Sequence, residues 1–210
     1  MFSILIFLAG LVIGATAKQQ LQRRQNLGEA LVANTLENLR CLHVLINNVT
    51  LPVENGSTQI DHILITEAGL FIIETKHYTG WIFGNPSGAK WTQQIYRVKN
   101  QFQNPLHQNF GHIKVVQALF KLPENAFTSV VVFTGSAEFK TDLGPNTILL
   151  DQLTGFIEQH REKVLDERQM AYVVGRIEMK RFGRSNETDE YHLNHVRSKF
   201  GRQYGAKESD

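Results

Sequence analysis

Three charged side chains in the middle of the chain have the types and spacing of a metal-assisted hydrolytic site. The apolar run LFIIETK, residues 70–76, contains Glu74 and Lys76, and the run before it, IDHILIT at 60–66, contains Asp61. An unpaired charge buried in a strand costs several kcal/mol. These side chains must therefore be exposed, neutralise one another or form a site.

The strand pattern predicts that the three side chains share one face of a hairpin. Side chains alternate along a strand, so Glu74 and Lys76 point to the same side. If the two runs form a hairpin that turns at Glu67-Ala68, Asp61 lies directly opposite Glu74. Two opposed carboxylates repel each other unless a cation lies between them. Because oxygen ligands favour a hard ion, we expect Mg²⁺ here, with Mn²⁺ as a substitute.

Lys76 would then position an attacking water or stabilise charge that develops on a phosphoryl group. Two further side chains could support the site. Glu29 lies on the apolar face of a predicted helix over 28–40, where it could be a further acidic ligand or hold a metal-bound water. Gln108 lies in the first turns of a helix that Asn104 and a following proline predict, where it could orient substrate or water.

A purely structural pairing of Glu74 with Lys76 is the alternative interpretation, because such pairs also neutralise each other at a sheet edge. Glu29 lies near the start of a predicted helix, so its negative charge could similarly have only the structural role of interacting with the helix dipole. With Asp61 and Glu29 the cluster has three carboxylates to one lysine, an excess that a structural ion pair does not require. The charge balance therefore favours a site.

The elements that must position these residues mix strands and helices. Runs rich in Ile, Leu and Val predict strands, and apolar stripes at helical spacing predict helices. The predicted strands are 41–49, 60–66, 70–76, 91–98, 127–134 and 147–150, and the predicted helices are 28–40, 104–120, 151–163 and 166–181. This order indicates an α/β fold with a mixed central sheet flanked by helices.

The first 17 residues, MFSILIFLAGLVIGATA, carry no charged side chain. As a helix they would be about 25 Å long, a short membrane span. Lys18, Arg23 and Arg24 follow this segment, so we expect a transmembrane anchor at 1–17, with the N-terminus outside and the domain in the cytoplasm. The alternative is a signal peptide that is cleaved after ATA, which would export the domain.

The composition limits the partners and cofactors. A chain of 210 residues, 42% of them hydrophobic, can form one substantial domain. The net charge of +2 is too small to predict a polyanionic partner, so contacts with nucleic acid must depend on local clusters of Lys and Arg. Cys41 is the only cysteine, which excludes an intrachain disulfide and a Cys-based zinc site. No Cys or acidic ligand at zinc-site spacing accompanies the pair His107 and His112 or the pair His192 and His195, which lies in a polar tail.

The order of these motifs resembles the nuclease-related domain (NERD) family. The matching features are Gly28-Glu29, Asp61, Glu74 with Lys76, Gly80, Trp91 and NPLHQ at 104–108. Ile60 stands before Asp61, where the signature of the wider superfamily has proline. The resemblance implies a PD-(D/E)xK nuclease with a restriction-endonuclease-like αβββαβ core, which hydrolyses phosphodiester bonds with Mg²⁺. It also favours DNA over RNA as the nucleic-acid partner.

These observations divide the chain into an anchor at 1–17, a polar linker at 18–26 and a nuclease-like core at 27–135. Residues 136–181 complete the domain, and residues 182–210 form a polar tail whose basic side chains either bind phosphates or are simply solvated. The alternative to an enzyme is a nucleic-acid-binding or scaffolding module that keeps the fold without the chemistry. Protein partners and oligomeric state do not follow from the sequence.

Overall fold

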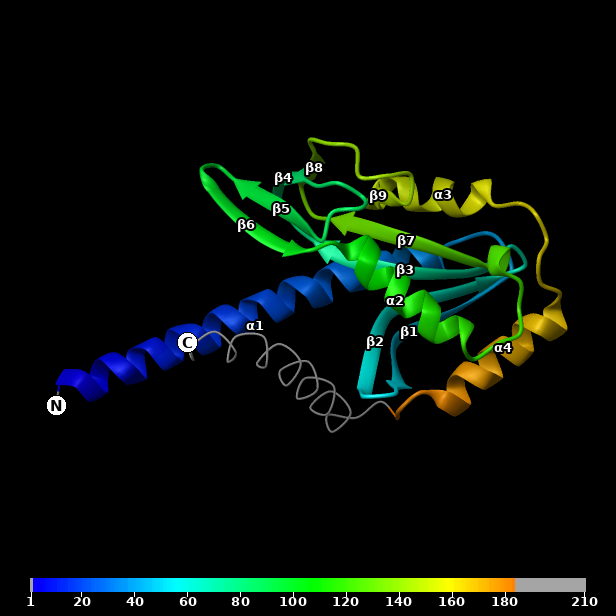
Figure 1. Cartoon of the computed structure of the whole chain (residues 1–210), viewed down its shortest axis with the longest axis horizontal. Helices are drawn as coiled ribbons and strands as arrows, with labels where there is room; N and C mark the ends of the chain where they lie inside the picture. Colours follow the sequence, from blue (N-terminus) through cyan, green and yellow to red (C-terminus); the bar gives the residue numbers. More distant parts are fainter. Residues whose placement is uncertain (1, 184–210) are drawn as a thin grey trace, which may run out of the picture.

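A computed structural model describes the backbone of residues 2–183 and the side chains of residues 19, 20 and 22–183. Its centre is a five-stranded sheet in the order β1-β2-β3-β7-β9 (Figure 1). The strands are β1 His43–Val53, β2 Gly56–Thr66, β3 Gly69–His77, β7 Phe127–Thr134 and β9 Thr147–Leu149. β1, β2 and β3 pair antiparallel, whereas β7 is parallel to β3 and to β9. The predicted α/β fold with a mixed central sheet is confirmed.

The β2–β3 hairpin has the predicted register. Its pairs include His62 with Ile73, and the pair nearest the turn is Thr66 with Gly69. Gly69 has a φ of +118°, a conformation that favours glycine, and a Cβ there would lie 2.6 Å from the Ala126 carbonyl oxygen. The turn is therefore fixed by backbone geometry, and with it the alignment of the two strands.

Within residues 2–183, four α-helices cover the central sheet, with two short 3₁₀ turns between elements. They are α1 Phe2–Glu37, α2 Pro105–Gln117, α3 Leu153–Gln159 and α4 Glu167–Lys180, and the 3₁₀ turns are Glu124–Ala126 and Leu150–Gln152. α2 and α4 pack on one face of the sheet, and α1 and α3 pack on the other (Figure 1). Alternation along β3 matches this arrangement. Ile72 packs in the hydrophobic core on the side of α2 and α4, and Phe71 packs in the core on the side of α1 and α3. β3 is thus covered on both faces.

α2 begins as predicted. The Asn104 side-chain oxygen accepts a hydrogen bond from Leu106 N at 2.9 Å, and Pro105 is the first helical residue. The helix ends at Gln117, earlier than predicted. Phe110 has helical spacing from Leu106 and Ile113, yet it is 60% exposed.

A smaller sheet in the order β6-β5-β4-β8 follows the carboxyl end of β3. Its strands are β4 Gly80–Phe83, β5 Lys90–Ile95, β6 Val98–Gln103 and β8 Ala137–Phe139. We expected 91–98 to form one strand, but the chain reverses at Tyr96-Arg97 and β5 pairs with β6 as a hairpin. No local signal marks this turn, because Tyr96-Arg97 contains no Gly, Asn or Pro. Tyr96 instead adopts a φ of +52°.

The two C-terminal helices lie where the sequence predicts them, but both are shorter than predicted. α3 ends at Gln159, inside the predicted 151–163. α4 is capped by Asp166 and Gln169, which exchange side-chain to backbone hydrogen bonds. Of the predicted tail at 182–210, only residues 182 and 183 belong to the part of the chain that the structure describes.

α1 is one continuous helix that includes the segments predicted as anchor and linker. The side chains of residues 1–18 lie outside the described part. Within that part, no helix is long and apolar enough to cross a membrane. This finding contradicts the predicted transmembrane anchor, and the single-pass localisation built on it was wrong. The physical reason is length, because these 17 uncharged residues, which include Ser3 and Thr16, rise only about 25 Å as a helix, whereas a hydrocarbon core is about 30 Å thick.

Candidate functional site

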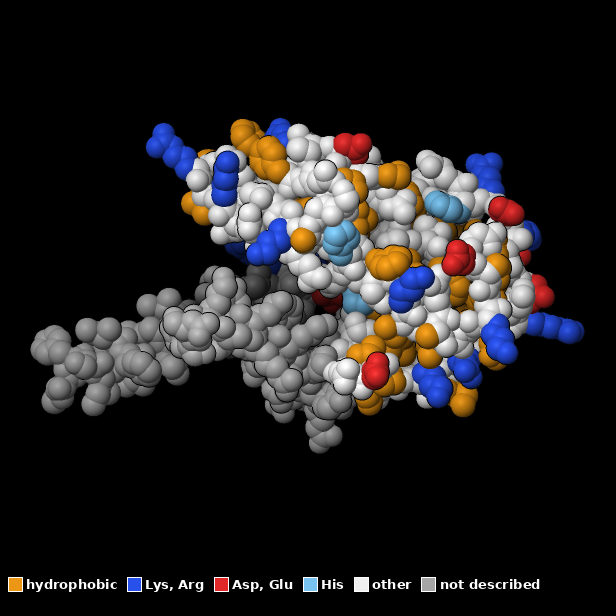
Figure 2. Space-filling view, viewed as in Figure 1, with side chains coloured by type: hydrophobic (Ala, Val, Ile, Leu, Met, Phe, Trp, Pro, Cys, Tyr) orange, Lys and Arg blue, Asp and Glu red, His pale blue; other side chains and the backbone are white. Residues whose placement is uncertain are grey.

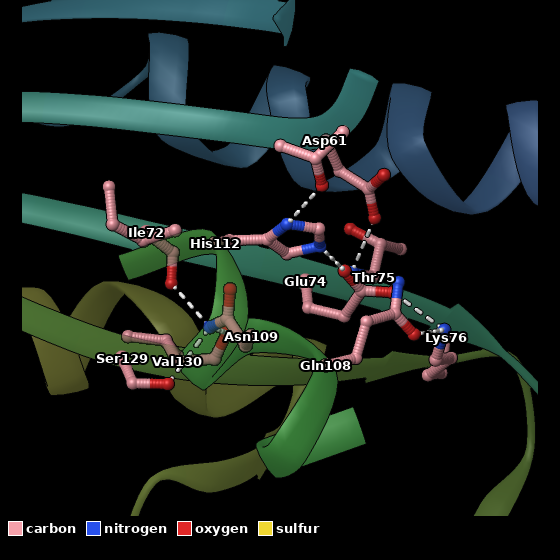
Figure 3. Close-up of polar contacts among 11 residues, drawn as sticks. Asp61, Ile72, Glu74, Thr75, Lys76, Gln108, Asn109, His112, Ser129 and Val130 are labelled. Atoms are coloured by element: carbon pink, nitrogen blue, oxygen red, sulfur yellow. Dashed lines mark hydrogen bonds and ion pairs between the residues drawn. The ribbon is translucent and has the colours of Figure 1, made fainter. Parts of the chain in front are cut away.

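The carboxyl end of β3 brings together side chains from separate elements (Figure 3). Asp61 comes from β2, Glu74 and Lys76 come from β3, and Gln108 comes from α2. Lys76 Nζ donates hydrogen bonds to Glu74 Oε1 at 2.6 Å and to Gln108 Oε1 at 3.2 Å. The structure therefore places these four predicted residues in one cluster.

The Glu74–Lys76 pair is almost completely shielded from solvent. The side chain of Glu74 is 3% exposed, and that of Lys76 is 15% exposed. An ammonium group has three N–H donors, and Lys76 uses one for the hydrogen bond to Glu74 and one for the hydrogen bond to Gln108. One donor is left for a water molecule or a phosphate oxygen.

Asp61 is fixed by the backbone of β3. Its Oδ2 accepts a hydrogen bond from Thr75 N at 2.8 Å. Regular pairing of β2 with β3 ends at His62 and Ile73, so this side chain satisfies the first N–H beyond the paired region on the β2 side. The other carboxylate oxygen, Oδ1, remains available for a ligand.

His112 is a site residue that sequence reasoning missed. Its Nε2 lies 3.3 Å from Glu74 Oε2, and its Nδ1 lies 3.0 Å from Thr58 Oγ1. The Nε2–Oε2 contact lacks hydrogen-bond geometry, so both atoms are buried without a hydrogen-bond partner. The sequence feature that could have identified His112 is its four-residue spacing from Gln108, which places both side chains on one helix face. We had considered His112 only as a zinc ligand.

Asn109 holds α2 at a fixed height above the sheet. The residue is fully buried, and its Nδ2 lies 2.7 Å from the Ile72 carbonyl oxygen and 3.1 Å from that of Val130. It also lies 2.9 Å from Ser129 Oγ. Because Ile72 is in β3 and Val130 is in β7, one amide links the helix to both strands.

Glu29 reaches the cluster because Gly28 lets α1 pass close to the end of β3. A Cβ at Gly28 would lie 2.7 Å from Thr134 Oγ1 and 2.8 Å from His77 Cβ. The carboxyl group of Glu29 is close enough for the charges of Glu74 and Lys76 to influence its pKa. His77, which we expected at the surface, is half-buried, and its Nδ1 lies 2.9 Å from Thr134 Oγ1.

The four titratable groups of the cluster respond differently to burial. Burial and the charges of Glu74 and Glu29 raise the pKa of Asp61 well above its usual range. Burial and the Glu74 charge also raise the pKa of Glu29. Burial alone would raise the pKa of Glu74, but Lys76 and His112 outweigh it and lower that pKa. Burial would lower the pKa of Lys76, but the Glu74 carboxylate raises it. Glu74 and Lys76 are therefore a charged pair, and Asp61 is the acid that keeps its proton to higher pH.

The donor set fits a hard divalent cation bound by few protein ligands. Among the described residues, no three or more His, Cys, Asp and Glu side chains are arranged to hold a metal ion. Mg²⁺ does not require three, because it usually keeps several waters and binds through one or two carboxylates. Glu74 Oε2 is a buried acceptor without a hydrogen-bond partner. The charge of Glu74 raises the pKa of both Asp61 and Glu29, and Glu29 also raises that of Asp61, a repulsion that a cation would offset.

Other features singled out in the sequence lie away from this cluster. Trp91 is buried, and its Nε1 donates to the Asn85 carbonyl oxygen at 2.9 Å, so it anchors a loop. Trp81 is 45% exposed, with Lys140 Nζ 4.9 Å from its ring centre. A hollow of about 360 Å³ lies beside Cys41 and the β2–β3 turn, and none of the site residues lines it. His192 and His195 lie outside the described residues.

The fold and the cluster together define an α/β domain with a buried acidic site that contains a lysine. The model of the nuclease-related domain matches residues 24–134, more than half of the chain. The chain belongs to the nuclease-related domain family, whose general class is the PD-(D/E)xK superfamily.

The chain is also similar to part of a bacterial protein. An uncharacterized protein of Bacillus anthracis is 50% identical over 97 residues, which cover 45% of this chain and 45% of that protein. The match therefore spans less than half the length of that relative. No solved structure is significantly similar to the chain.

Proposed function

We propose that this protein is a metal-dependent nuclease that hydrolyses phosphodiester bonds in nucleic acid, with DNA the favoured substrate. The observation that carries the proposal is the meeting of Asp61, Glu74 and Lys76 at the end of one hairpin in a member of the nuclease-related domain family. The element order α1-β1-β2-β3-α2-β7, read without the smaller sheet, supports a restriction-endonuclease-like αβββαβ core.

Each side chain of the cluster has a role in this proposal. Asp61 and Glu74 hold Mg²⁺ or Mn²⁺ through their carboxylate oxygens. The ion, when bound, supplies Lewis-acid stabilisation and lowers the pKa of a bound water. Lys76 uses its remaining donor to orient the attacking water or to neutralise charge on a non-bridging phosphate oxygen. Gln108 holds the Lys76 ammonium in place, and Glu29 accepts a hydrogen bond from a water in the site.

The test is cleavage of DNA and RNA by the purified full chain, with Mg²⁺, with Mn²⁺ and with a chelator. We expect metal-dependent cleavage that falls at least about 100-fold in Asp61→Ala and in Lys76→Ala. Lys163→Ala is the matched control, because it breaks an exposed Lys–Glu pair of 2.8 Å with Glu67, at the turn of the same hairpin. Cleavage that survives both site substitutions would show that the catalytic centre lies elsewhere.

A second candidate is a nucleic-acid-binding module without catalysis. The observation that favours it is that Glu74, one of the two proposed metal ligands, already contacts both Lys76 and His112. Such a module would bind DNA with an affinity that falls steeply as salt rises, because contacts to phosphates release counterions. Salt-sensitive binding that Asp61→Ala leaves intact, with no cleavage of any substrate in either metal, would favour this candidate over the enzyme.

A further inference from the structure

The net positive charge of the chain comes from one segment that lacks acidic residues. Residues 75–123 contain six Lys or Arg and no Asp or Glu, so the rest of the chain carries a net negative charge. This segment comprises the end of β3, strands β4 to β6 and α2. A net charge of +2 for the whole chain conceals this asymmetry. Local cationic character of this kind attracts a polyanion.

The hairpin of β5 and β6, residues 90–103, presents a polar face that has no acidic residue. Lys90 pairs with Gln103, and Gln94 pairs with Lys99. By strand alternation, one face carries Lys90, Thr92, Gln94, Lys99, Gln101 and Gln103. The opposite face carries Trp91 and Phe102, whose rings pack against each other. The aromatic face fixes the hairpin to the domain, and the polar face offers ammonium and amide donors.

The tip of this hairpin displays an aromatic side chain in a strained backbone conformation. Tyr96 is 93% exposed and has a φ of +52°. Glycine or asparagine would occupy this turn position with little strain, whereas tyrosine does not. Arg97 is beside it in the turn, and Lys99 follows two residues later. A strained turn that exposes an aromatic ring next to two cations is typical of a ligand contact.

Both ends of the hairpin are attached next to the candidate site. On one side, β3 carries Lys76, and Gln93 Nε2 of the hairpin donates to the Thr79 carbonyl oxygen, just beyond β3, at 2.9 Å. On the other side, β6 leads through Asn104 into α2, which carries Gln108. In Figure 1 the hairpin projects from the end of the sheet where β3 ends and α2 begins, and Figure 2 shows Lys and Arg side chains at its outer end.

We propose that the β5–β6 hairpin is a nucleic-acid-binding arm. Lys90, Arg97 and Lys99 contact backbone phosphates, and Tyr96 stacks on an unpaired base. The face suits nucleic acid because it combines cations with amide donors, excludes carboxylates and ends in an aromatic ring. The inference rests on the proposed function, since it gives the site the means to hold its substrate.

The experiment measures the binding of fluorescent single-stranded and duplex DNA by the full chain, with a chelator present to prevent cleavage. The variants are Tyr96→Gly, which also relieves the turn, and the double variant Arg97→Ala/Lys99→Ala. The control is Arg168→Ala/Lys180→Ala, which removes two exposed cations from α4. Thermal melting verifies that each variant is folded.

For Arg97→Ala/Lys99→Ala we expect a plot of log affinity against log salt, over about 50 to 200 mM, that is less steep by about 1.4 to 1.8. For Tyr96→Gly we expect about tenfold weaker binding of single strands with an unchanged slope. The α4 control should bind like the wild type. Hairpin variants that bind both DNA forms like the wild type, or a control that weakens binding equally, would overturn the inference.

The same preparations are then assayed for cleavage with Mg²⁺, which separates the two proposals. Binding that depends on the hairpin without cleavage by any preparation would refute the nuclease and leave the arm intact. Cleavage that is equal in the wild type and in the hairpin variants would uphold the nuclease and refute the arm. Wild-type protein that binds no nucleic acid refutes the arm.

Discussion

Lys76 stabilises a buried carboxylate in addition to its proposed chemical role. Glu74 is 2% exposed, so removal of its ammonium partner leaves an uncompensated charge inside the protein. We expect Lys76→Met to lower the free energy of unfolding by about 3 kcal/mol. The double variant Glu74→Gln/Lys76→Met should recover most of this loss, because it removes both charges. Urea unfolding of the wild type and the two variants provides the measurement, and equal stability of the two Lys76→Met proteins would argue against a buried charge pair.

Asp61 makes the stability of the metal-free protein depend on pH. Burial and the neighbouring carboxylates raise the pKa of Asp61, so the folded state holds this proton more tightly than the unfolded state does. Stability from this group is therefore greatest below the unfolded pKa of about 3.9 and is lost as pH rises through the raised folded value.

Asp61→Asn removes this penalty. We expect the metal-free variant to be more stable than the wild type at pH values above the folded pKa of Asp61, and this advantage to shrink as the pH falls toward about 4. Mg²⁺ should stabilise the wild type more than the variant, because the variant lacks a proposed ligand. Denaturant midpoints with and without Mg²⁺ provide the measurement. A stability difference that is independent of pH would contradict the raised pKa.

At the scale of elements, the approach of α1 to the sheet depends on Gly28. A methyl group there would meet His77 Cβ and Thr134 Oγ1 at less than 3 Å. Gly28→Ala should improve the intrinsic helix propensity by about 1 kcal/mol but cost about 1 to 3 kcal/mol in overpacking. We therefore expect a modest net loss of thermal stability, together with lower cleavage because Glu29 moves outward. The control is Gly175→Ala in α4, where an added Cβ meets nothing within 4 Å and should only stabilise. Equal effects of the two substitutions would show that α1 is not tightly docked.

Elements with local signals could be predicted from the sequence, and those set by distant contacts could not. The β2–β3 register followed from a short turn between two apolar runs, and the start of α2 followed from Asn104 before Pro105. The β5–β6 turn was missed because Tyr96 takes a left-handed conformation that its residue type does not indicate.

The candidate site shows the same division. Strand alternation and hairpin register were enough to bring Asp61, Glu74 and Lys76 together. The role of His112 depends on how far α2 stands above β2 and β3, which Asn109 determines through contacts with Ile72 and Val130. No local pattern encodes such a distance. The membrane anchor was predicted wrongly for a different reason. The prediction used only the uncharged pattern of the N-terminal segment, and a local pattern does not establish that a helix lies in a membrane.

At the scale of the whole molecule, the two sheets have different roles: one carries the candidate site and the other carries the proposed binding arm. The five-stranded sheet, covered by helices on both faces, holds the site residues rigidly. The smaller sheet begins three residues after β3 and carries the acid-free hairpin. A rigid cluster beside a cationic arm should associate with nucleic acid at a rate that falls with ionic strength. Stopped-flow measurements at several salt concentrations would reveal this dependence, and a rate independent of salt would contradict it.

The parallel pairing of β3 with β7 also has a consequence during synthesis. All the proposed site residues, and His112, precede residue 113, whereas the second edge of β3 is filled by residues 127–134. A nascent chain that ends before β7 therefore contains every reactive side chain but exposes the apolar edge of its central strand. Non-local parallel pairing forms late in folding. We expect a chain cut at residue 121 to aggregate without cleaving nucleic acid, so nuclease activity would appear only after most of the domain has been synthesised.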